Sequence, residues 1–247
     1  MKVSLVVNRI TEDIEENFKR IVNAISKYSD ETDLFLFPES AITGLINNDD
    51  PSHDLPIASP IPGRYTRILS HVAKERSVHI GIGMLERDGY KLYDSAILIN
   101  SFGEIALHYR RITPTWHGKN ADPKVYCEGT ELKKVKTNLG TFAFLICGDL
   151  FDDSLIGKIR KLQIDYLLYP FSRCFKDGTY NQERWEDEKH EYIKRIKLAK
   201  STTLMVNTLA HKALDGGSFG GAMIVSSSGE IIKEIPIGKE GILHAEI

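Results

Sequence analysis

A five-residue pattern, Ser-x-Gly-Glu-Ile, occurs twice in this chain, at positions 101–105 and 227–231. Each copy joins two short apolar runs, at 92–100 and 105–109 in the first case and at 223–226 and 231–235 in the second. Apolar runs of this length on either side of a glycine-containing turn are typical of a β-hairpin. Because one such hairpin lies in each half of the chain, the sequence predicts two related halves.

Each half also contains apolar runs that alternate with helical patterns. The first half has strand-like segments at 3–8, 33–37 and 78–84, a helix beginning at Thr11 and another helix at 65–76. The second has strand-like segments at 142–146, 165–169 and 204–208, with helices at 153–162 and 182–200. Residues 47–63 contain four prolines and three aspartates and are expected to form a surface loop.

This alternation predicts an α/β fold in which two mixed sheets pack face to face with helices outside. The expected architecture is a four-layer α-β-β-α sandwich with a pseudo-twofold internal repeat. No linker-like segment divides the sequence, so residues 1–247 are expected to form a single domain.

The charges exclude some classes of partner. The 32 basic and 34 acidic residues are mixed along the chain and give a net charge of −2, with no basic stripe for a nucleic acid and no polybasic membrane anchor. The first ten residues lack the features of a signal peptide, so a cytoplasmic location is expected. Three widely spaced cysteines fit neither a disulfide framework nor a zinc pattern, and the eight histidines lack ligand spacing, so no metal site is expected.

One cysteine stands where an apolar run ends. Residues 142–146 are predicted to be a buried strand, and Cys147, Gly148 and Asp149 follow it as a tight turn. A side chain at such a turn is held by the sheet yet is accessible to a ligand, as a nucleophile requires; the alternative is a buried structural cysteine. Glu39 follows the run at 33–37 in the same way, where it either takes part in chemistry or caps the next turn.

Four short motifs then occur in a specific order: Phe-Pro-Glu-Ser at 37–40 with Thr-Gly at 43–44, Tyr-Arg-Arg at 109–111, Ile-Cys-Gly-Asp at 146–149, and Phe-Gly-Gly at 219–221. In that order they resemble the carbon-nitrogen hydrolase (nitrilase) superfamily over nearly the whole chain. The resemblance implies an α-β-β-α sandwich, a Glu-Lys-Cys catalytic set, no cofactor, and hydrolysis of small amides, nitriles or carbamoyl compounds. By position, Glu39 matches the general base and Cys147 the nucleophile. The resemblance also implies a homodimer or a multiple of one.

The residues present suit this chemistry. A thiol with a free pKa of about 8.5 needs only a modest decrease to ionise at neutral pH. A nearby carboxylate can accept its proton and later activate water, and the backbone N–H of Gly148 is a natural donor to the oxyanion of a tetrahedral intermediate.

The chain departs from the family at Arg111, which stands where a lysine is usual. Arginine remains charged in proteins, so it can stabilise an anion but cannot shuttle a proton. Three alternatives are open. Arg111 acts as the fixed positive group of an enzyme, or Lys119 or Lys124 takes the place of the lysine, or the chain has lost hydrolysis.

Other residues are candidates for substrate binding. The resemblance implies a second glutamate that positions the substrate, a role open to Glu128 or Asp122. Glu128 is favoured because residues 126–129 resemble the family's turn, and the alternative is a solvent-exposed loop acid. Selectivity is expected from the loops 113–125, 171–184 and 210–221, where Arg173 is a candidate partner for a polar substrate tail. Cys127 is expected to be incidental, and Cys174 is expected to line the pocket.

Two classes of function follow. The first is a cofactor-independent hydrolase that uses Cys147, Glu39 and Arg111. The second is a module of the same fold that binds a small molecule or a protein without hydrolysis. The presence of Cys147 together with Glu39 favours the enzyme, because a binding module has no need of a thiol paired with a base.

Overall fold

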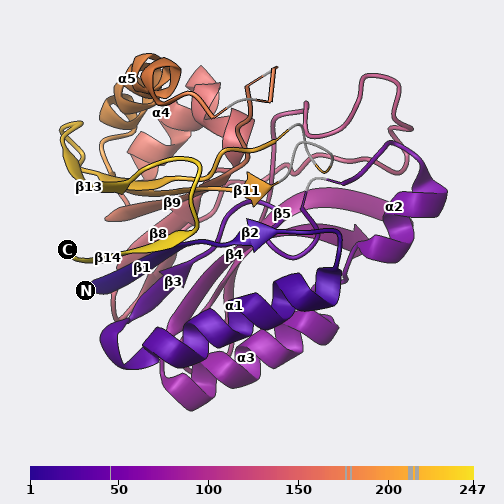
Figure 1. The fold of residues 1–247 in the computed structure, drawn as a ribbon, viewed down its shortest axis with the longest axis horizontal. Coiled ribbons are helices and arrows are strands. Elements are labelled where there is room, and N and C mark those ends of the chain that lie inside the picture. The colour runs from indigo at the N-terminus through magenta and orange to yellow at the C-terminus, as the bar shows by residue number, and fades with distance from the viewer. Residues whose placement is uncertain (45, 176, 179, 211–213, 215–216) are drawn as a thin grey trace.

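The computed structural model describes residues 1–44, 46–175, 177–178, 180–210, 214 and 217–247. Two six-stranded sheets pack face to face, and helices cover both outer faces (Figure 1). The layers therefore follow the order helix, sheet, sheet, helix, which confirms the predicted α-β-β-α sandwich. Buried aliphatic and aromatic side chains fill the spaces between these layers.

The first sheet is built mainly from the first half of the chain. Its strand order is β14-β1-β3-β4-β5-β6, with β1, β3 and β4 parallel and β4, β5 and β6 antiparallel. The C-terminal strand β14 lies antiparallel to β1. The bounds are β1 Lys2–Val7, β3 Leu34–Leu36, β4 His79–Asp88, β5 Lys91–Ile99, β6 Ile105–Arg110 and β14 Gly241–Glu246.

The second sheet has the order β13-β12-β10-β9-β8-β7. Strands β8, β9 and β10 are parallel, whereas β10, β12 and β13 are antiparallel, so the pattern of the first sheet recurs. The bounds are β7 Val135–Thr137, β8 Gly140–Phe144, β9 Tyr166–Phe171, β10 Thr202–Asn207, β12 Ala222–Val225 and β13 Ile231–Ile235. A short parallel pair, β2 (Arg9–Ile10) and β11 (Leu209–Ala210), links the two halves.

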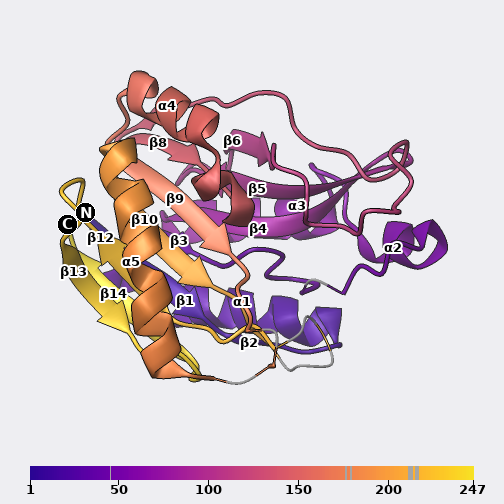
Figure 2. The same ribbon diagram turned by 90° about the horizontal axis from the view of Figure 1, so that it is seen from above.

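Two helices lie side by side on each outer face (Figures 1 and 2). Helices α1 (Ile14–Tyr28) and α3 (Arg64–Arg76) cover the first sheet, and α4 (Asp153–Leu162) and α5 (Gln182–Ala199) cover the second. Helices α1, α4 and α5 are capped by the side chains of Asp13, Asp152 and Asn181, respectively. Each of these side chains accepts a hydrogen bond from a backbone N–H of the first turn. Among the described residues, no helix combines the length and apolar character needed to cross a bilayer.

The turns that predicted the internal repeat are equivalent in structure. In each turn the glycine N–H donates to the carbonyl three residues earlier at 2.9 Å, from Gly103 to Asn100 and from Gly229 to Ser226. A Cβ at Gly103 would clash with α3, and a Cβ at Gly229 would clash with α5. These helices are equivalent, because each follows the second parallel strand of its own repeat. The order strand, helix, strand, helix, strand, hairpin therefore occurs twice, which confirms the predicted repeat.

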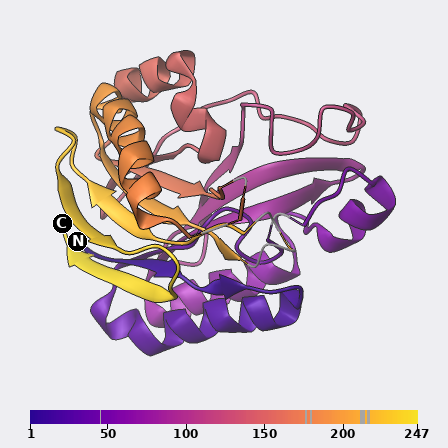
Figure 3. The same ribbon diagram turned by 45° about the horizontal axis from the view of Figure 1, so that its top comes forward.

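The prediction for residues 47–63 was incomplete. This segment contains a helix, α2 (Pro51–Ile57), which lies at the end of the molecule remote from both termini (Figure 3). Asp50 caps it by accepting from Ser52 N, and Pro51 occupies the first helical position, where a proline breaks no hydrogen bond. The buried Asp54 accepts from the Tyr126 hydroxyl at 2.5 Å. A contact distant in sequence thus stabilises a helix that the prolines had obscured.

Other differences concern the ends of elements. The helix predicted from Thr11 begins at Ile14, because Asp13 caps it. The strands β7 and β14 and the short pair β2 and β11 were not predicted, since each is two to six residues long and depends on a partner strand.

Candidate active site

Cys147 lies just after the end of β8 and begins a 3₁₀ turn, Cys147–Phe151. Its φ of 44° lies in the left-handed region, which turns the chain sharply out of the strand direction. The Tyr169 hydroxyl donates to the Cys147 carbonyl at 2.7 Å, and the Cys147 thiol lies 3.6 Å from the carbonyl oxygen of Ser172. The thiol is therefore held at the ends of two adjacent parallel strands, β8 and β9, and remains partly accessible.

Asp149 connects this turn to the segment that follows β6. Its Oδ2 accepts from the Tyr109 hydroxyl at 2.6 Å and from Ile146 N at 3.1 Å. Its Oδ1 accepts from Thr113 N and Thr113 Oγ1, each at 2.8 Å, and from Ile112 N at 3.2 Å. Five donors satisfy this fully buried carboxylate, so Asp149 fixes the position of the cysteine turn relative to the first sheet.

Glu39 follows β3 and is completely buried. Strand β4 lies so close that a Cβ at Gly83 would come within 2.6 Å of the Glu39 Cα, so a side chain at position 83 would displace Glu39. From the second half of the chain, Thr208 Oγ1 donates to the Glu39 carbonyl at 3.0 Å. Contacts from both repeats therefore fix the backbone of Glu39.

Arg111 follows β6 and is only 3% exposed. Its Nη1 lies 3.1 Å from Glu39 Oε1 and 3.3 Å from Asp94 Oδ2. Its Nη2 donates to Thr115 Oγ1 at 3.1 Å, and a Cβ at Gly148 would come within 2.6 Å of the same nitrogen. The guanidinium thus lies between the Glu39 carboxyl and the cysteine turn.

The electrostatics of the site follow from burial. Burial raises the pKa of Glu39 well above its usual value, and the negative charges of Cys147 and Asp94 raise it further, against the lowering effect of Arg111. Burial likewise raises the pKa of Asp94, which hydrogen bonding to Glu39 and the charge of Arg111 partly offset. Burial opposes the charge of Arg111, but the anionic groups at Cys147, Glu39 and Asp94 more than compensate and raise its pKa. The guanidinium is therefore a permanent cation here.

Asp94 was missed by the sequence reasoning. It lies on β5, is 1% exposed, and its carbonyl accepts from Arg111 N at 2.8 Å. The available signal was a carboxylate inside a segment predicted to be a buried strand, where an unpaired charge is costly. Thr113, Thr115 and Thr208 were also missed, and nothing in their sequence context distinguishes them.

The two candidates for a second acid have other partners. Glu128 Oε1 lies 3.0 Å from His117 Nε2, and the Glu128 side chain is about one-third exposed, at 34%. Asp122 is exposed and accepts from Lys124 N at 2.9 Å, as in a capped turn. The described contacts join neither acid to Glu39, Arg111 or Cys147. Their assignment to substrate binding stays a prediction.

The remaining candidates lie near the second sheet. The Arg173 guanidinium pairs with Glu188 through two hydrogen bonds of 2.9 and 2.7 Å, so a substrate carboxylate would have to compete with Glu188 for it. Cys174 is partly buried, and Lys119 and Lys124 are exposed. The loops 171–184 and 210–221 include positions outside the described residues, among them His211.

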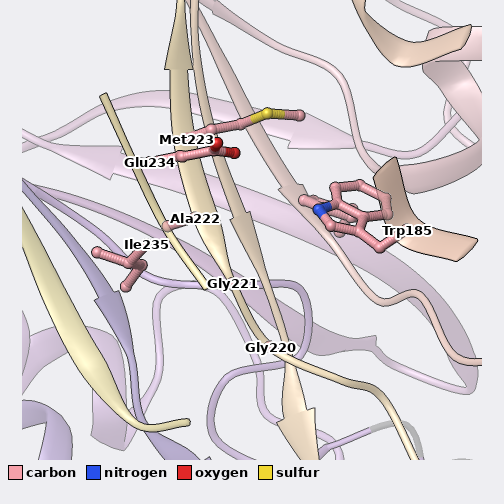
Figure 4. A pocket seen from close by; sticks show the side chains of 8 residues that line it. Trp185, Gly220, Gly221, Ala222, Met223, Glu234 and Ile235 are labelled. Carbon is pink, nitrogen blue, oxygen red and sulfur yellow. The ribbon is translucent and has the colours of Figure 1, made fainter. Parts of the chain in front are cut away.

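One small cavity lies apart from this cluster (Figure 4). Phe171, Trp185, Met223 and Glu234 are among the residues that line it. Its volume of about 10 Å³ is enough for roughly one water molecule, so it cannot admit an amide substrate. In the described part of the chain, no three His, Cys, Asp or Glu side chains are grouped as a metal site.

This arrangement of a thiol, a buried carboxyl and a buried cation agrees with comparison to known proteins. The family model described as "Carbon-nitrogen hydrolase" matches residues 2–247, and the chain belongs to this family. Family membership, expected from the motif order, is thereby confirmed.

Individual relatives are distant. The chain is 28% identical to an (R)-stereoselective amidase of Pseudomonas sp. over 56% of this chain and 47% of that protein, so the match spans about half the length of that relative. It is 22% identical to a deaminated glutathione amidase of Dictyostelium discoideum over 96% of this chain and 84% of that protein.

Among solved structures, a mutant of an amidase from Nesterenkonia sp. AN1 superposes with a TM-score of 0.82 at 14% identity, covering 100% of this chain and 90% of that chain. That mutant carries the acetamide moiety of fluoroacetamide at its active-site cysteine. At this identity the likeness supports a shared fold.

Proposed function

We propose that this chain is a cofactor-independent, amidase-like hydrolase that cleaves a non-peptide carbon–nitrogen bond through a thioester on Cys147. The observation that carries the proposal is the buried ion pair of Glu39 and Arg111, placed beside the cysteine turn at the strand ends of both sheets. The substrate is a small amide, nitrile or carbamoyl compound. The amidases among the relatives favour an amide.

For an amide, the reaction begins when Cys147 transfers its proton to Glu39 and the sulfur attacks the carbonyl carbon. The carbonyl oxygen becomes an oxyanion, which the N–H of Gly148 and the charge of Arg111 stabilise. When the carbonyl re-forms, the carbon–nitrogen bond breaks. The proton on Glu39 then passes to the leaving nitrogen, which departs as ammonia or an amine.

Hydrolysis of the thioester restores the enzyme. Glu39 takes a proton from water as the water oxygen attacks the thioester carbon. The carbon–sulfur bond breaks, a carboxylic acid is released, and the proton on Glu39 returns to Cys147. Arg111 donates no proton in either step. In this proposal, the fixed charge of Arg111 fills the electrostatic role of the family's lysine.

The test is the rate of alkylation of Cys147 by iodoacetamide, itself a small primary amide, measured against pH with the adduct located by mass spectrometry. We expect fast, saturable labelling confined to Cys147 at neutral pH, slowed by Glu39→Gln and by Arg111→Ala. Cys127 and Cys174 serve as internal controls. Slow labelling spread evenly over the three cysteines would refute the proposal and favour the binding module.

We also propose that the chain assembles as a homodimer or a multiple of one. The support is its family membership. Light scattering that detects only a 27.9 kDa species would contradict this.

A further inference from the structure

Two carboxyl groups meet the same nitrogen of Arg111. Glu39 Oε1 and Asp94 Oδ2 lie 3.1 and 3.3 Å from Nη1, and both acids are at most 1% exposed. The second oxygens of these carboxyls, Glu39 Oε2 and Asp94 Oδ1, are buried, and no donor within the described residues reaches either of them. The two carboxyls are thus neighbours on one nitrogen, and burial raises the pKa of each.

The charges in this region do not balance if both acids are ionised. Asp149 is also fully buried, but five donors satisfy it. Glu39 and Asp94 have one cation between them, so full ionisation would leave an excess negative charge among buried groups. Two buried carboxyls that share a site avoid this electrostatic cost by holding one proton between them.

We propose that Asp94 is a positioning residue of this hydrolase, which holds Arg111 against Glu39, and that the two carboxyls share one proton. The inference rests on the proposed function for its catalytic meaning. The acceptor of the Cys147 proton is then a carboxyl pair with a single negative charge. When that pair takes a second proton, both acids become neutral and Arg111 is left to stabilise the oxyanion.

The groups that face the pair from every neighbouring element are known. Arg111 and Tyr109 approach from β6 and the segment after it, Cys147 and Asp149 from the turn after β8, Tyr169 from β9 and Tyr192 from α5. Arg111 is the cation among them, and the Tyr109 hydroxyl donates a hydrogen bond to Asp149 Oδ2. The pH dependence of the site therefore reports mainly on the Glu39–Asp94 pair.

The first test uses the resting protein and does not depend on activity. Infrared spectra at pH 7, with ¹³C in the side-chain carboxyls of aspartate or of glutamate, are expected to show one buried protonated carboxyl. This band should disappear in Asp94→Asn and persist in Glu86→Gln, where a different buried carboxylate is removed. Absence of a protonated carboxyl in the wild type overturns the inference, even if Asp94→Asn does not fold.

The second test is the pH dependence of Cys147 alkylation by iodoacetamide. As pH rises, the wild-type pair can lose its shared proton and gain a second negative charge beside Cys147. Asp94→Asn prevents that second charge, so the midpoint is expected to move to lower pH by about one unit or more, and Asp94→Glu to restore it. A purely structural role would lower the amount of folded protein and leave the midpoint unchanged, which would overturn the inference. If wild-type Cys147 reacts no faster than Cys127, the proposed hydrolase fails while the infrared test still decides the shared proton.

Discussion

Two consecutive residues, Arg110 and Arg111, each pair with a buried carboxylate, yet the two acids behave in opposite ways. Arg110 contacts Glu86 with Nη2 at 2.5 Å from Oε1, and Arg111 contacts Glu39 with Nη1 at 3.1 Å from Oε1. Both acids are at most 1% exposed. The pKa of Glu86 is lowered to about 2, whereas that of Glu39 is raised.

The difference lies in the number of donors. Burial alone would raise the pKa of Glu86, but hydrogen bonds from His108, Arg110 and Ser95 reach both of its oxygens and stabilise the anion. Glu39 has one guanidinium nitrogen, which it shares with Asp94. An arginine beside a buried acid therefore does not by itself fix the protonation state. A fully satisfied carboxylate is a permanent anion, and a partly satisfied one can accept and release a proton.

The sharpest test of this comparison is to neutralise each acid in turn and measure turnover of a small amide. Glu39→Gln removes the proton acceptor and is expected to lower kcat by about 10³-fold, within the range for loss of a general base. Glu86→Gln, the matched control, should leave kcat within about a factor of three, since Glu86 is outside the site. A comparable loss of kcat in both variants would contradict the assignment of Glu39 as the proton acceptor.

For stability, the order of the two variants is expected to be reversed, with the larger loss in Glu86→Gln. In Glu86→Gln the partly exposed Arg110 loses its anionic partner, and Ser95 and His108 lose an anionic acceptor. The free energy of unfolding in urea is therefore expected to fall by on the order of 3 kcal/mol. Glu39→Gln leaves Asp94 as the anionic partner of Arg111 and should cost less than about 1 kcal/mol. A larger cost for Glu39→Gln than for Glu86→Gln would contradict the assignment of Glu86 as the structural anion.

The pH dependence of stability separates the two acids without reference to activity. The folded-state pKa of Glu86 is depressed from 4.5 to about 2, so its contribution is present above about pH 4.5 and is lost as pH falls toward 2. Glu39 has a raised pKa, so the folded state loses stability as pH rises from about 4.5, the ordinary pKa of a glutamate, to the higher folded-state pKa of Glu39. Thermal unfolding of Glu86→Gln should therefore depend less steeply on pH between 4.5 and 2. An unchanged slope would indicate that other acids dominate this range.

Replacing each arginine by lysine should give the smallest effects. Arg110→Lys loses the forked contact with Glu86 and is expected to lower stability by about 1 kcal/mol with no change in turnover. Arg111→Lys keeps a positive charge and should retain turnover within about tenfold, whereas Arg111→Met should lose about 10²-fold or more. Equal turnover in Arg111→Lys and Arg111→Met would exclude the fixed charge as the role of Arg111.

The strand-end positions of Glu39 and Cys147 could be predicted because each follows a short apolar run, and such a run indicates a buried strand whatever surrounds it. Arg111 was found through the motif around it. Asp94 could not be predicted to meet Glu39, because the meeting depends on the order β3-β4-β5-β6 and on the absence of a side chain at Gly83. Helix α2 was missed since proline is a signal for loops and first helical turns alike.

The backbone angles at the site have a consequence for how such a chain can change. Ser40, next to the candidate base, has a φ of 45°, and Cys147 itself has a φ of 44°. This conformation costs roughly 1 kcal/mol for a residue with a Cβ and little for glycine. Selection for thermal robustness alone would thus favour Cys147→Gly, a change that removes the thiol. A stability-based screen of variants would therefore enrich for proteins that lack the nucleophile of the proposed function.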